Sequence, residues 1–76
     1  MKSVDIELSA TERVKAFVNI ANRYPYPVLL RQGRFVVNGK SILGIFSLDR
    51  TKPITMDAYT DQYADLMQDL RQVRIC

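Results

Sequence analysis

Ser41 is the residue whose type and surroundings most clearly point to chemistry. It follows the turn signal Asn38-Gly39 and precedes a short apolar run. A serine hydroxyl at the start of a helix accepts a hydrogen bond from a backbone N–H that would otherwise lack a partner. The same hydroxyl can carry a phosphate, which adds charge and three strong acceptor oxygens. The residues alone leave both roles open: a plain helix cap, or a cap that phosphorylation would alter.

The apolar run after Ser41 predicts a short helix with an exposed hydrophobic side. Five large apolar residues are too many for one narrow buried stripe on such a helix, so we expect some of them to face solvent or a partner. They are Ile42, Leu43, Ile45, Phe46 and Leu48.

Other reactive groups are sparse, and the chain contains no histidine. This excludes a histidine base, a phosphohistidine and a His/Cys metal cluster. The eight carboxylates have no metal-loop or catalytic spacing, and the single cysteine, Cys76, cannot form an internal disulfide. We therefore expect no enzymatic activity, no cofactor and no metal.

Length and composition predict one small domain covering residues 1–76. The hydrophobic fraction is 47% and the net charge is +3, with acidic and basic residues interleaved. No apolar run is long enough to span a bilayer, so we expect a cytoplasmic protein without membrane contact. The positive charge leaves open a nucleic-acid-binding module that stacks bases on Tyr26, Phe35 and Tyr59, but these aromatics do not form the expected cluster.

The N-terminal half shows a strand, a helix and a hairpin. Lys2 to Leu8 alternates polar and apolar residues, which indicates a half-buried strand. Ser9-Ala10-Thr11-Glu12 matches a capping box for a helix that Pro25 should stop at about Tyr24. Strands are expected at 28–31 and 35–37, joined by a turn at Gln32-Gly33.

The C-terminal half adds the short helix after Ser41, a strand and a last helix. Residues 54–59 alternate as a strand, and Thr60 or Asp61 is expected to cap the final helix. The order βαββαβα predicts an α+β fold with one antiparallel sheet and helices on one face. The expected core comprises Val4, Ile6, Leu8, Val14, Phe17, Val18, Ala21, Val28, Leu30, Ile45, Leu48, Ile54, Met56, Leu66, Met67 and Leu70.

The stretch Lys40-Ser41-Ile42-Leu43-Gly44 resembles the segment that opens the second helix of the HPr family. These are small phosphocarriers of the bacterial phosphoenolpyruvate-dependent sugar phosphotransferase system, and their segment reads Lys-Ser-Ile-Met-Gly. The resemblance covers the whole chain in pattern, but only this segment is specific. It implies a two-layer, open-faced β-sandwich with a four-stranded antiparallel sheet and three helices on one face.

The chain departs from the family where the phosphorylated histidine should stand. Ala10 falls at the histidine position, Glu12 at the arginine position and Arg13 at the proline position. Alanine has no nucleophile, and a glutamate would repel a phosphoryl group. Phosphoryl transfer from Enzyme I is therefore expected to be lost, unless the protein is a phosphocarrier that uses another residue.

The resemblance implies that Ser41 is a regulatory phosphorylation site for an ATP-dependent kinase. It also implies partner contacts by Lys40, Ile42, Leu43, Phe46 and Arg13. The expected partners are proteins: HPr kinase, a transcription regulator or components of the phosphotransferase system, with no direct contact to nucleic acid. The apolar helix also allows a homodimer contact, so we expect a monomer or a weak homodimer.

Overall fold

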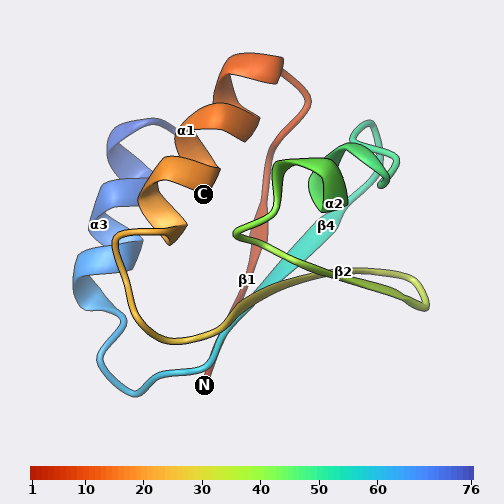
Figure 1. Cartoon of the computed structure of the whole chain (residues 1–76). Coiled ribbons are helices and arrows are strands. Elements are labelled where there is room, and N and C mark those ends of the chain that lie inside the picture. The colour runs from red at the N-terminus through yellow and green to blue at the C-terminus, as the bar shows by residue number, and fades with distance from the viewer.

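The computed structural model describes all residues, 1–76, and has the predicted element order. The chain forms four strands and three helices, whose arrangement is drawn in Figure 1. In chain order they are β1 (Lys2–Ile6), α1 (Thr11–Ala21), β2 (Val28–Gln32), β3 (Phe35–Asn38), α2 (Ile42–Phe46), β4 (Ile54–Ala58) and α3 (Ala64–Gln72).

The four strands form one antiparallel sheet in the order β1-β4-β2-β3. The α+β class, the element order and the open four-stranded sheet are confirmed. The β2–β3 hairpin has Gln32 opposite Phe35, so its loop is Gly33-Arg34, one residue later than predicted. Gly33 has a φ of +58°, a conformation that glycine adopts without a steric penalty.

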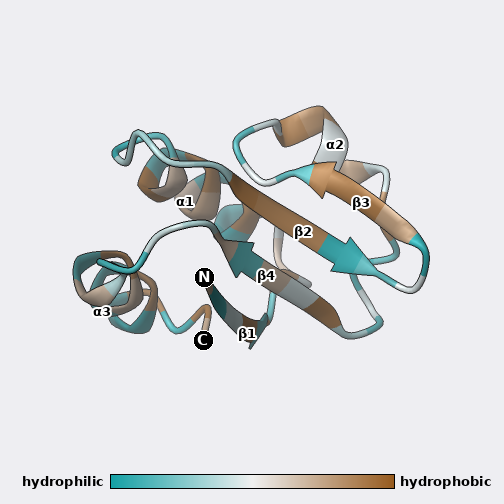
Figure 2. Ribbon diagram, turned by 90° about the horizontal axis from the view of Figure 1, so that it is seen from below, coloured by the Kyte–Doolittle hydropathy of each residue, from teal (hydrophilic) through white to brown (hydrophobic).

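One face of the sheet and the three helices enclose a single core. Met56 of β4 lies opposite Leu30 of β2, and Phe17 of α1 packs into the same cluster. Figure 2 shows α1 and α2 on the same side of the sheet, and α3 packs against α1. Val4 and Val18 are only partly buried, so their assignment to the full core was wrong. Three core residues were not predicted: Ile20, Ala58 and Ile75.

Two predicted helix starts are wrong. The N-cap of α1 is Ala10, without a side-chain hydrogen bond, and the Ser9 N–H donates to Glu7 Oε1 at 2.6 Å. The capping box therefore does not form. In a capping box the Glu12 side chain would accept from the Ser9 N–H, but here Glu7 binds that N–H. Helix α3 begins after Tyr63, and the Thr60 hydroxyl accepts from Gln62 N–H in the preceding turn. Helix α1 ends at Ala21, although hydrogen-bonded turns continue to Tyr24.

The uncovered face of the sheet carries a buried carboxylate. Asp57 of β4 is 5% exposed and accepts two hydrogen bonds from the Arg31 guanidinium, at 2.7 and 3.2 Å. The Ser3 hydroxyl of β1 donates to the same carboxylate at 2.7 Å. These contacts join three adjacent strands. The Arg31 hydrogen bonds, followed by that from Ser3, lower the pKa of Asp57.

No helix in the structure is long and apolar enough to cross a membrane.

Candidate functional site

The turn before α2 fixes the position of Ser41. Asn38 closes the turn twice: its side-chain oxygen accepts from Lys40 N–H at 2.9 Å, and its carbonyl accepts from Ser41 N–H at 3.0 Å. Gly39 is buried against β2, where an added Cβ would lie 2.8 Å from the Val28 carbonyl oxygen. The turn signal in the sequence therefore reflects a position that only glycine fits.

Ser41 is the N-cap of α2, as its position in the sequence predicts. Its hydroxyl oxygen accepts from the Gly44 N–H at 3.2 Å, and the side chain is partly exposed. The cap therefore satisfies one of the free N–H groups at the helix start while the hydroxyl remains near the surface.

Helix α2 buries one side and exposes the other. Ile45 is fully buried and Leu48, just after the helix, is 8% exposed. Ile42, Leu43 and Phe46 are 37%, 80% and 41% exposed, and we call these three residues the α2 apolar surface. The expected exposure of an apolar side of this helix is confirmed.

Arg50 connects the α2 apolar surface to the start of α1. Its guanidinium lies 4.8 Å from the centroid of the Phe46 ring, within the range of a cation–π contact. The same guanidinium donates to the carbonyl oxygens of Leu8 and Ser9, both at 3.2 Å. Arg50 was not among the residues singled out in the sequence, because no local pattern places it beside Phe46 or the β1–α1 connection.

Lys40 is less available to a partner than its place beside Ser41 suggests. Its ammonium donates to the Tyr24 carbonyl oxygen at 2.6 Å, and its own carbonyl accepts from the Asn22 amide at 3.5 Å. Lys40 therefore ties the end of α1 to the start of α2. A partner that engaged this ammonium would compete with the Tyr24 carbonyl.

The start of α1 is where the HPr resemblance would place a phosphorylated histidine, and it carries no imidazole. Ala10 is the N-cap, Glu12 is exposed, and Arg13 forms an ion pair with Glu7. Hydrogen bonding from Ser9, and secondarily the charge of Arg13, lower the pKa of the Glu7 carboxyl. An acidic side chain that stays ionised and already holds Arg13 does not favour phosphate binding there.

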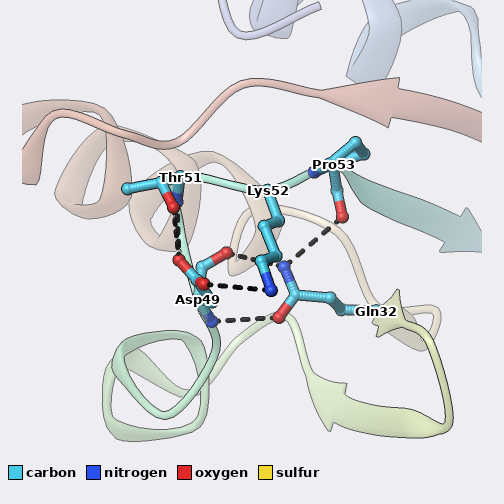
Figure 3. Close-up of polar contacts among 5 residues, drawn as sticks. All are labelled: Gln32, Asp49, Thr51, Lys52 and Pro53. Carbon is cyan, nitrogen blue, oxygen red and sulfur yellow. Dashed lines mark hydrogen bonds and ion pairs between the residues drawn. The ribbon is translucent and has the colours of Figure 1, made fainter.

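A polar cluster centred on Gln32 and Asp49 holds the loop after α2 against the β2–β3 hairpin (Figure 3). The Gln32 side-chain amide donates to the carbonyl oxygens of Asp49 and Pro53, at 2.6 and 3.4 Å, and accepts from Asp49 N–H at 2.9 Å. Asp49 also accepts two hydrogen bonds from Thr51, which are the first causes of its lowered pKa. An open hollow of about 670 Å³ lies beside this cluster. The cluster fixes the loop that carries Arg50.

The three aromatic residues considered for base stacking do not share a sheet surface. Phe35 lies on the helix-covered side of the sheet, in line with Val37, whereas Tyr59 follows β4. Tyr26 precedes β2, and its ring lies 5.5 Å from that of Tyr24. Tyr24 in turn donates to Asp69 of α3 at 2.6 Å, which raises the pKa of Tyr24 to about 12. Both tyrosines pack against the hydrophobic core.

Comparison of the chain with protein-family models gives no match, and comparison with curated proteins gives none either.

Proposed function

We propose that this protein is an HPr-like, non-catalytic regulatory protein of a bacterial sugar phosphotransferase system. It acts in the cytoplasm by binding other proteins, and phosphorylation of Ser41 switches that binding. One observation carries the proposal: a partly exposed serine caps α2 next to an exposed apolar surface.

The sequence and the fold support this assignment at two levels. The segment Lys40 to Gly44 resembles the corresponding HPr segment, and its serine has the capping geometry that the resemblance implies. The βαββαβα order and the four-stranded antiparallel sheet also agree with the fold of that family. Ala10 removes the nucleophile of the phosphocarrier reaction, so the proposed role is regulatory.

A phosphate on Ser41 would change the surface without opposing the helix. It would add about −1.5 to −2 charges at the helix start, where the helix dipole favours negative charge. The new charge would lie beside Ile42 and Leu43, so the partner should combine an apolar pocket with arginine side chains. The phosphate would also lie next to Lys40, whose ammonium could turn from the Tyr24 carbonyl towards it.

The proposal is tested by the intact mass after incubation with an HPr kinase and ATP. The wild type should gain about 80 Da, the mass of one phosphoryl group. Ser41→Ala should gain nothing, whereas Ser47→Ala, which removes the hydroxyl at the other end of α2, should gain phosphate like the wild type. No gain in the wild type would leave Ser41 as a helix cap and would contradict the proposed switch.

A parallel incubation with phosphoenolpyruvate and Enzyme I tests the non-catalytic part of the proposal. We expect no change in mass. A gain of about 80 Da without ATP would make the protein a phosphocarrier that uses another residue.

A further inference from the structure

Strand β3 has a free edge whose backbone groups are available for pairing. It is the outermost strand and pairs only with β2. Gly39 N–H donates to the Val28 carbonyl at 2.7 Å, and Leu29 lies opposite Asn38. In an antiparallel ladder the hydrogen-bonded pairs alternate, so Phe35 and Val37 point their backbone groups towards β2. The N–H and C=O of Val36 and the N–H of Asn38 therefore point away from the sheet.

The side chains on this edge are apolar and exposed. Phe35 is 65% exposed and Val36 is 56% exposed, and the strand contains no charge and no proline. Figure 1 shows the β2–β3 hairpin extending beyond the helices. Exposed edge strands usually carry charges, prolines or a covering segment that prevents pairing with another chain.

The opposite edge of the sheet has such protection. Strand β1 carries Lys2 and Asp5, and just beyond it Glu7 N–H donates to the Ile75 carbonyl at 2.8 Å. The C-terminal segment thus covers one end of the β1 edge. On β3 the Asn38 carbonyl is bound by the Ser41 N–H, but no other segment of the chain binds the outward backbone groups of Val36. The β1 edge therefore has features that prevent pairing with another chain, whereas Phe35, Val36 and Val37 of β3 have none of them.

We propose that β3 pairs with β3 of a second copy of this chain, antiparallel, with Val36 opposite Val36 of the other copy. In this register the outward N–H and C=O of each Val36 bond to those of the other Val36, Arg34 lies opposite Asn38, and the two sheets join into one continuous eight-stranded sheet. Phe35 then lies opposite Val37 of the other copy, an aromatic–β-branched pair of the kind that stabilises sheets.

Charge and symmetry favour a second copy as the occupant. No two charged residues lie directly opposite each other in this register, since Arg34 faces Asn38. The two copies of Arg34 lie four residues apart along the joined strands, about 14 Å, which exceeds the screening length of about 8 Å at physiological salt. The contact is short, so the dimer should be weak, with a dissociation constant of about 0.1–1 mM.

The test is sedimentation velocity over protein concentrations from about 10 μM to 1 mM, the range that spans such a dissociation constant. The mass of the wild type should rise from 8.8 kDa towards twice that value. Val36→Lys should remain monomeric. Val36→Pro should do the same, because it removes an outward N–H and no bond within the sheet. Val73→Lys, the same change at an exposed valine at the C-terminal end of α3, should still dimerise.

Amide hydrogen exchange gives a second readout at the residue itself. Exchange at Val36 N–H should slow as the concentration rises, while exchange at Val37 N–H, already bonded within the hairpin, should change less. A constant mass at all concentrations would overturn the proposal, as would dimerisation of both Val36 variants. A dimer that Leu43→Lys abolishes and Val36→Lys retains would assign the contact to the α2 apolar surface instead. None of these outcomes depends on the phosphorylation of Ser41.

Discussion

At the residue scale, Arg74 ends the last helix in a conformation that glycine usually adopts. Its φ is +58°, and it follows Val73, the C-cap of α3. Arg74 N–H donates to the Arg71 carbonyl at 3.1 Å, and Ile75 N–H donates to the Leu70 carbonyl at 3.0 Å. These two bonds form a Schellman motif, which turns the chain so that Ile75 enters the core.

Arg74→Gly should therefore stabilise the protein. The left-handed conformation costs a non-glycine residue about 1–2 kcal/mol, and glycine removes this cost. Part of the resulting stabilisation is lost because glycine has more conformational freedom in the unfolded chain. We expect the free energy of unfolding to rise by about 0.5–1 kcal/mol, measured by urea denaturation. Arg71→Gly, within the helix, is the matched control and should lower it by about 1 kcal/mol. Equal effects at the two positions would contradict this account of the helix end.

At the element scale, the two sides of α2 have different roles: one packs into the core and the other faces solvent. Ile45 and Leu43 are two residues apart, yet Ile45 is fully buried and Leu43 is 80% exposed. A five-residue helix cannot form by its own propensity, so its buried side must hold it against the sheet and α1. Substitutions on the exposed side should therefore have little effect on the free energy of unfolding.

We expect Ile45→Ala to lower the free energy of unfolding by about 2–5 kcal/mol, the usual range for a cavity in a core. Leu43→Ala should change it by less than about 0.5 kcal/mol, since little buried surface is lost. Urea denaturation of both variants measures the difference. A large loss in Leu43→Ala would mean that this side chain supports the fold, and its use as a binding residue would lose its basis.

At the scale of the whole molecule, Asp57 ties the sheet together and makes its stability depend on pH. Its carboxylate binds Arg31 of β2 and Ser3 of β1, and its pKa is lowered in the folded state. In the unfolded chain the pKa returns to about 3.9. The stabilisation is therefore complete above about pH 5 and is lost as the pH falls through the folded pKa.

Asp57→Asn should lower the free energy of unfolding at pH 7 by about 1.5–3 kcal/mol, the range for hydrogen bonds to a charged group. As the pH falls through the lowered pKa of the folded state, the wild type and the variant should converge, because the wild-type carboxyl is then protonated too. Asp5→Asn, an exposed carboxylate on β1, should have a smaller effect. Denaturation curves from pH 2 to about 8 test this. A constant difference between Asp57→Asn and the wild type across that range would contradict it.

The sequence by itself determined the element order, most of the core and the cap at Ser41. Those features depend on residue periodicity and on turn signals that act over a few positions, such as the alternation of β1 and the Asn38-Gly39 turn. Local signals failed at Ser9, whose N–H donates to Glu7, and at Thr60, whose hydroxyl accepts from the Gln62 N–H in a turn before the helix.

Only the tertiary structure decided which of these elements lie side by side. The Arg31–Asp57 pair joins residues 26 positions apart, and Arg50 reaches the Ser9 carbonyl across 41 positions. The strand order β1-β4-β2-β3 places β3 at the free edge and the C-terminal segment beside β1. No periodicity contains this information, because contacts between distant segments depend on how whole elements pack around one core.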